Sequence, residues 1–252
     1  MFDGIIPQAG TENHSAAIQA AIEEAVRRDQ RQVCIPEGDW YLEAPIVLPE
    51  QFHLHLDGAR LIWKGEGAAY LLQNSVIHTP RALTKYGKQR GITVTGERGA
   101  GFFGSSGIYF YNVGDFTVKG LVFDCEEGNG LTLVYCEHGR IGALEFCSCK
   151  VGVEVCIGTA NCFFYQITGK AAQNLLSMDS RERQEMVYYQ NPQVKNHIVR
   201  RVSGEAGEYL IRLEGKDCED VILEDVENFG SAESGVWIQD AQGVTLKKIA
   251  FK

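Results

Sequence analysis

The sequence contains little proline and no long apolar run. Six of its 252 residues are proline and 28 are glycine, a composition that suits many tight turns between ordered strands. Because no stretch of about 18 apolar residues occurs, we expect no transmembrane helix and no membrane partner. The first residues, MFDGIIPQAGTENHS, lack the basic and apolar regions of a secretory signal. We therefore expect a cytoplasmic protein by default, with a trimmed secreted protein as the alternative.

Positive charge is also scarce. The 24 lysines and arginines are outnumbered by 33 aspartates and glutamates, which gives a formal net charge of −9 and a pI of about 5.2. No basic stripe is present, and this argues against nucleic-acid binding, which usually depends on one. Hydrophobic residues make up 44% of the chain, enough for one sizeable core, and we predict a single domain over residues 1–252.

The eight cysteines form no recognisable metal-binding motif. Cys147 and Cys149 make a C-x-C pair, whereas structural zinc sites usually combine two closely spaced ligand pairs. A chain of this length does not need disulfides for stability. We interpret the cysteines as small apolar residues of the core, and we predict neither a metal nor a cofactor.

The strongest positive signal is a repeat of about two dozen residues. Six segments share the pattern apolar-x-x-apolar, and their first members follow one another at intervals of 23, 23, 35, 24 and 23 residues. The pairs are Val118/Leu121, Ile141/Leu144, Phe164/Ile167, Val199/Val202, Leu223/Val226 and Leu246/Ile249. The one long interval contains extra residues, and we predict an insertion over residues 179–193.

A second series of short alternating strands runs between these segments and shows the same interruption. Its inward-facing residues are predicted to be Ile108, Leu131, Val153, Leu175, Ile211 and Val236. Short β-rich segments separated by glycine, asparagine and aspartate indicate stacked coils rather than a helical repeat. The predicted fold class is therefore all-β, a right-handed single-stranded parallel β-helix in which like residues stack about 4.8 Å apart.

The two ends of the predicted solenoid differ. The segment SAAIQAAIEEAVRRD is amphipathic, and we predict a helix over residues 15–29 that caps the first coil. At the other end the sequence LKKIAFK has a strand pattern without a visible cap. We expect this edge either to be covered by another subunit, which would make a homo-oligomer, or to be guarded by its lysines.

Five segments carry a family resemblance: SAAIQAAIEEA, VCIPEGDWYL, APIVL, HLHLDGARLIW and RGITVTGERGAGFFG. They resemble the capping helix and opening coils of pectin-lyase-like β-helix proteins, and among these the polygalacturonase branch, which comprises glycoside hydrolases of pectin. The resemblance implies a carbohydrate-active protein whose partner is an acidic or plant-type polysaccharide or oligosaccharide.

The resemblance leaves most catalytic positions of that family unmatched. Polygalacturonases carry Asn-Thr-Asp where this chain has Glu-Gly-Asn at 127–129, Asp-Asp where it has Lys-Val at 150–151, and His-Gly where it has Gln-Asn at 173–174. Their Arg-Ile-Lys is matched in part by Arg-Leu-Glu at 212–214. Of the catalytic groups usual in polygalacturonases, this chain therefore retains the arginine, as Arg212.

Candidate catalytic residues lie on the outward positions of the second series. The predicted outward stack is Tyr109, Thr132, Glu154, Leu176, Arg212 and Trp237. Glycoside hydrolysis ordinarily needs two carboxyl groups about 5–9.5 Å apart. Glu154 is the acid of the stack, and its candidate partners are Glu214, two coils or about 9.6 Å away, and Asp179 at the end of its strand.

Elimination of a uronate is the alternative chemistry, because it needs a base and a cation that neutralises the sugar carboxylate. Arg212 or Lys150 could supply this cation. Tyr109 and Trp237 suit stacking against sugar rings, although aromatic residues also favour strands for structural reasons. We group Tyr109, Trp237, Lys150 and Thr132 as candidate substrate-binding residues.

Two classes of function remain open from the sequence. The first, which we favour, is an enzyme of the glycoside hydrolase type, with a polysaccharide lyase as a less favoured variant. The second is a catalytically degenerate β-helix that binds glycans or assembles. The unmatched catalytic positions support the second class, and in it Glu154 and Arg212 form only a surface ion pair.

Overall fold

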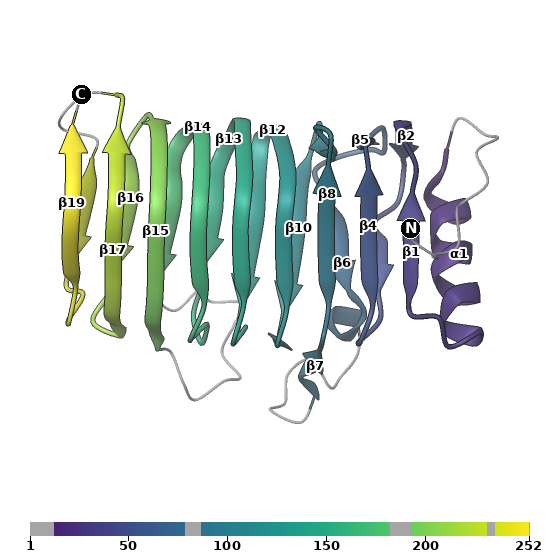
Figure 1. The fold of residues 1–252 in the computed structure, drawn as a ribbon, viewed down its shortest axis with the longest axis horizontal. Helices are drawn as coiled ribbons and strands as arrows, with labels where there is room; N and C mark the ends of the chain where they lie inside the picture. Colours follow the sequence, from purple (N-terminus) through teal and green to yellow (C-terminus); the bar gives the residue numbers. More distant parts are fainter. Residues whose placement is uncertain (1–12, 79–86, 182–192, 231–234, 252) are drawn as a thin grey trace.

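The structure is a computed structural model, and it describes residues 13–78, 87–181, 193–230 and 235–251. This part of the chain winds into a right-handed parallel β-helix of about eight turns, with one α-helix at the N-terminal end (Figure 1). Neighbouring coils lie side by side along the long axis, and the paired strands in these residues run parallel. The predicted fold class is confirmed.

The strands form three faces that run along the solenoid. The first face contains β1 (Gln32–Ile35), β4 (His53–Asp57), β8 (Thr93–Glu97) and the first parts of β12 (Thr117–Val134), β13 (Arg140–Val155), β14 (Phe163–Asp179), β15 (Val194–Ala206), β17 (Cys218–Asn228) and β19 (Thr245–Phe251). The second face contains β2 (Gly38–Leu42), β5 (Ala59–Trp63), β9 (Gly101–Phe103) and later parts of the same long strands.

The third face contains β3 (Ile46–Leu48), β6 (Tyr70–Asn74), β10 (Ser106–Tyr111), the last parts of β12, β13 and β14, then β16 (Tyr209–Glu214) and β18 (Val236–Gln239). Three short elements lie outside these faces: the 3₁₀ helix η1 (Ser75–His78), β7 (Gln89–Arg90) and its partner β11 (Val113–Gly114). No helix among the described residues is long and apolar enough to cross a membrane.

The helix α1 (Ser15–Arg27) covers the first coil, as its amphipathic pattern predicts. It ends two residues before the predicted boundary, because Asp29 adopts a left-handed conformation with φ of 56°. The Gln19 side chain accepts a hydrogen bond from the Val47 backbone N–H at 3.0 Å and ties the helix to β3. Its apolar side packs into the core through Ile18, Ala21, Ile22 and Ala25.

The apolar-x-x-apolar pattern marks a corner of the coil. Val118 and Leu121 are both buried although they lie three residues apart, because Gly120 between them has φ of 72° and turns the strand. Non-glycine residues take the same left-handed conformation in the later coils. They are Ala143, Gln166, Arg201, Asp225 and Lys248. The predicted first series stacks in register through all six coils.

The second series is also in register, with one correction. Leu176, and not Leu175, stacks between Val153 and Ile211. The cause is a bulge between the register pairs Cys149/Ala171 and Val151/Asn174, where one residue of β13 faces two residues of β14. An extra residue reverses the inward and outward alternation of everything after it, and Leu176 therefore points inward rather than outward.

The cysteines behave as core residues. All eight are free thiols, and only Cys147 among them is exposed. Burial raises the pKa of the Cys136 and Cys218 thiols to about 12. These thiols therefore stay protonated near neutral pH, which makes them poor nucleophiles.

Buried His197 gives the fold a predicted sensitivity to acid. Its Nδ1 accepts a hydrogen bond from the Cys162 backbone N–H at 3.3 Å, and its Nε2 lies 3.1 Å from the Thr159 carbonyl oxygen. Burial lowers the pKa of His197 to about 4, whereas an unfolded histidine has a pKa of about 6.5. The unfolded state therefore binds a proton first as the pH falls between these values.

We expect the free energy of unfolding to fall by about 2 kcal/mol from this residue between pH 7 and pH 5. Denaturant unfolding of the wild type and of His197→Phe at several pH values measures it. The variant is less stable throughout, but its stability should change less with pH. His138→Asn, at an exposed turn, serves as the control. Equal pH slopes in the wild type and His197→Phe would refute the assignment.

Candidate functional site

The outward positions of the third face form one continuous row, here called the outward ladder. Its members in register are Gln73, Tyr109, Thr132, Glu154, Ser177, Arg212 and Trp237. Five of the six predicted members are correct. Leu176 is wrong, because the bulge in β14 turns it into the core and places Ser177 outside. The ladder therefore carries a hydroxyl where an apolar side chain was predicted.

Two tyrosines lie near the N-terminal end of the ladder, Tyr70 on β6 with Gln73 and Tyr109 on β10. Tyr70 and Tyr109 lie with ring centroids 4.9 Å apart at an interplanar angle of 31°. The Tyr70 hydroxyl is hydrogen-bonded to Thr132 Oγ1 at 2.9 Å. Burial raises the pKa of both tyrosines, so both hydroxyls stay protonated near neutral pH. This end of the ladder therefore presents two partly buried aromatic rings whose hydroxyl groups can still donate a hydrogen bond.

Glu154 occupies the middle of the ladder within a polar network. Its Oε2 accepts hydrogen bonds from Asn129 Nδ2 at 2.8 Å and from Thr132 Oγ1 at 3.3 Å. Thr132, Glu154 and Ser177 are each less than a tenth exposed. Glu154 is therefore a largely buried acid in the middle of the ladder.

Four charged residues form a cluster beside Ser177. Asp179 and Glu214 lie directly opposite each other on β14 and β16. Arg181 bridges them, with ion pairs of 2.6 Å to Asp179 and 2.5 Å to Glu214. Arg212 also pairs with Glu214, which is 6% exposed. The two guanidinium groups offset the repulsion between the two neighbouring carboxylates.

An aromatic platform forms the far end of the ladder. The rings of Tyr209 and Trp237 stack with centroids 5.3 Å apart and an interplanar angle of 17°. The Arg212 guanidinium lies 5.3 Å from the centroid of the Trp237 ring, within the range of a cation–π interaction. Both aromatic residues are half-buried. The charged cluster and the platform therefore form one connected unit.

The register gives the approximate distances between the Cα atoms of the three candidate acids. Asp179 is one strand across and two residues along from Glu154, roughly 8 Å between Cα atoms by strand geometry. Glu214 is two strands across and two residues along, roughly 12 Å. The sequence estimate of about 9.6 Å for Glu214 left out the displacement along the strand. By this geometry Asp179 lies closer to Glu154 than Glu214 does.

Lys150 lies apart from these contacts. It is exposed on β13, four residues before Glu154. The next residue, Val151, stacks in register between Asn129 and Asn174. In the polygalacturonase resemblance these three positions correspond to two aspartates and a glycine, and here they are occupied by two asparagines and a valine.

Several residues of the site were not found from the sequence. Tyr70, Asn129 and Tyr209 contact ladder residues, and Arg181 pairs with Glu214 in the charged cluster beside the ladder. Tyr70 precedes an irregular stretch that breaks the repeat, so the repeat spacing does not assign Tyr70 to a position in a coil. Asn129 and Tyr209 lie at the start of their strand segments, where alternation no longer tells which side a residue faces. Most of the predicted insertion, with its two tyrosines, lies outside the described residues.

Comparison with known proteins supports the fold. No protein-family model matches the chain, and no curated protein matches its sequence. The structure is similar to PfbA, a surface adhesin of Streptococcus pneumoniae, with a TM-score of 0.67 and 13% identity over 93% of this chain and 62% of that one. It is also similar to the A-module of the Azotobacter vinelandii mannuronan C-5 epimerase AlgE6, with a TM-score of 0.64 and 14% identity over 93% and 71%.

A third similar structure is the family GH82 iota-carrageenase from A. fortis, with a TM-score of 0.59 and 16% identity over 90% of this chain and 54% of that one. The chain spans less than two thirds of the adhesin and of the carrageenase. At these identities the likeness shows a shared fold, the parallel β-helix, and does not single out the polygalacturonase branch.

Proposed function

We propose that this protein is a carbohydrate-active β-helix that binds an extended acidic polysaccharide along the outward ladder. The observation that carries the proposal is the order of the side chains, with aromatic pairs at both ends and hydroxyl, carboxyl and guanidinium groups between them. Aromatic rings offer rigid apolar faces, and a few fixed polar groups give orientation. From β10 to β18 the ladder spans five strand spacings, roughly 24 Å, enough for several sugar rings.

The cations of the site favour an acidic sugar chain. Arg212 lies over Trp237, where its guanidinium can meet a carboxylate or sulfate on a sugar that stacks on the ring. The Arg212 Nε is buried and makes no hydrogen bond within the described residues. A buried N–H without a partner is energetically unfavourable, and an oxygen of a bound ligand could accept its hydrogen bond. Lys150 adds an exposed positive charge on β13.

For catalysis we propose hydrolysis with Glu154 as proton donor and Asp179 as the base that activates water. Their side chains leave the same face from Cα atoms roughly 8 Å apart by strand geometry, a spacing that allows the separation of about 6.5–9.5 Å between the carboxyl groups of inverting enzymes. Glu154 accepts hydrogen bonds from Asn129 and Thr132, and Asp179 pairs with the Arg181 guanidinium. Elimination of a uronate by the same residues, with Arg212 as the cation, is the variant.

A specific observation favours a second candidate, glycan binding without turnover. Asp179 and Glu214 are both held in ion pairs with arginines, and the carboxylate cluster of the polygalacturonase resemblance is missing. One structurally similar protein, PfbA, is described as a surface adhesin. In this candidate the ladder recognises a sugar chain but does not cleave it.

Three polysaccharides test the proposal: polygalacturonate, iota-carrageenan and mannuronan. Released reducing ends without ultraviolet-absorbing products indicate hydrolysis, and unsaturated absorbing products indicate elimination. Calorimetric binding without any product supports the second candidate. If the protein neither binds nor cleaves any of a broad panel of acidic glycans, the proposed function is wrong.

The platform provides a sharper test of where the glycan lies. Trp237→Ala should weaken binding of the glycan identified above by about 5- to 10-fold, because a lost stacking contact is worth roughly 1–1.5 kcal/mol. Tyr165→Ala is the matched control, since Tyr165 also lies in an aromatic pair, with Phe163, but on the first face. Equal losses in the two variants would place the glycan elsewhere.

A further inference from the structure

We propose that His55, Asp57 and Glu97 bind a divalent transition-metal ion of the Zn²⁺ type on the first face, away from the outward ladder. One potential ligand atom from each side chain lies within 4.8 Å of the others. His55 and Asp57 are alternate residues of β4 and point to the same side of it, and Glu97 is the register partner of Asp57 on β8. The site joins two neighbouring coils close to α1 (Figure 1).

The ligand atoms are already near the spacing that a metal requires. Zinc binds histidine nitrogen at 2.0–2.1 Å and carboxylate oxygen at 2.0–2.2 Å, which places tetrahedral ligands roughly 3.3 Å apart. His55 Nε2 and Glu97 Oε1 are 3.6 Å apart. The side chains of Asp57 and Glu97 are a third and more than half exposed, so small rotations can bring all three ligand atoms to this spacing.

Thr95 holds the imidazole in the orientation that ligation needs. Its hydroxyl oxygen lies 2.9 Å from His55 Nδ1 and 2.8 Å from His53 Nε2. If Nδ1 carries the proton and donates it to Thr95, the lone pair of Nε2 is directed towards Glu97. Metal-binding histidines are commonly oriented in this way through their second ring nitrogen.

The donor set distinguishes between metals. One imidazole and two carboxylates suit Zn²⁺ or Co²⁺, which accept mixed nitrogen and oxygen ligands and leave a fourth position for water. Calcium prefers six to eight oxygen ligands and is a poor match for a nitrogen donor. The site therefore belongs to the transition-metal class.

Arg98 competes with a metal ion for the Asp57 carboxylate and thereby limits the affinity of the site for metal. Its guanidinium pairs with Asp57 and lies 3.6 Å from Glu37. A metal ion has to displace this guanidinium from Asp57. Because Arg98 is half exposed, its side chain has room to move into solvent. Replacing Arg98 by glutamine should therefore strengthen metal binding by about 2- to 5-fold, the scale of one exposed ion pair.

Calorimetry and optical titration with Co²⁺, on protein without an affinity tag, test the proposal. We expect one Co²⁺ per chain, a rise in the melting temperature with metal, and at least a 10-fold loss of affinity in His55→Ala and in Glu97→Gln. Thr95→Val should lower affinity about 10-fold although it removes no ligand. Arg98→Gln should raise it.

Two controls separate this site from adventitious binding. His138→Asn removes another histidine near a carboxylate, 3.4 Å from Asp115, and should leave affinity unchanged. Cys147→Ser removes the exposed thiol and should also have no effect. The proposal is overturned if wild-type protein binds no Co²⁺, if His55→Ala and Glu97→Gln bind as wild type does, or if either control abolishes binding.

Discussion

Replacing Phe123 with alanine is expected to lower the free energy of unfolding by about 3–5 kcal/mol. Phe123 is fully buried between Phe102 and Phe146, with ring centroids 5.4 and 5.1 Å away and nearly parallel planes. The three rings are register partners on β9, β12 and β13, whose backbone hydrogen bonds hold the neighbouring rings in place. The cavity left by the missing ring therefore cannot collapse, and both stacking contacts are lost.

Denaturant unfolding measures the loss, and Phe229→Ala is the matched control because Phe229 is 47% exposed. The control should change stability by less than about 0.5 kcal/mol. Because each coil contacts only its neighbours, hydrogen exchange should speed up in β9, β12 and β13 more than in β16. Unfolding midpoints that agree between the two variants would contradict the importance of this aromatic stack.

Glu154→Gln is expected to lower kcat/KM by about 10²- to 10⁴-fold on whichever polysaccharide the protein cleaves, the scale of one lost general acid. Glutamine keeps the size of the side chain and can still accept the hydrogen bond from Asn129 Nδ2. It cannot deliver a proton to the leaving sugar oxygen. The glycan should still bind with nearly the same affinity, so the loss should appear in kcat rather than KM.

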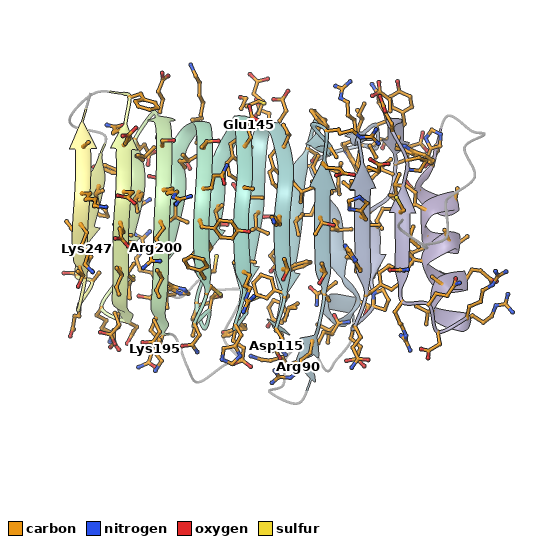
Figure 2. All side chains as sticks on the ribbon, in the orientation of Figure 1. Arg90, Asp115, Glu145, Lys195, Arg200 and Lys247 are labelled. Atoms are coloured by element: carbon orange, nitrogen blue, oxygen red, sulfur yellow. The ribbon has the colours of Figure 1, made fainter. Side chains whose placement is uncertain are left out.

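Glu145→Gln is the matched control for this substitution, because Glu145 is an exposed acid on the same strand at the upper edge of the solenoid (Figure 2). Asp179→Asn should lose activity to a comparable degree, whereas Glu214→Gln should not if Glu214 acts only as an ion-pair partner. Full activity of Glu154→Gln on a cleaved substrate would remove Glu154 from the mechanism.

Much of the fold can be predicted from the sequence because a solenoid repeats one local pattern. Val118 and Leu121 recur as an apolar pair in every later coil, and equal spacing makes equivalent residues stack. The amphipathic segment at the start gives the capping helix for an equally local reason. Both signals lie within about two dozen residues of sequence, which is why composition and spacing suffice.

The sequence also determines most of the outward ladder, since strand alternation assigns Tyr109, Thr132 and Glu154 to one side. It fails at Leu176, because a bulge is set by how two neighbouring strands pair and leaves no clear mark in either strand alone. The one extra residue therefore places Leu176 in the core and Ser177 on the outward ladder.

Only the tertiary structure decides which charges meet. Arg212 turns to Glu214 in its own strand, and Arg181 reaches across to the same carboxylate. The group of His55, Asp57 and Glu97 likewise depends on two strands that lie about 40 residues apart in sequence but next to each other in space. Periodicity fixes which residues share a face, whereas side-chain rotation and cross-coil contacts, which depend on all neighbours together, fix what those residues bind.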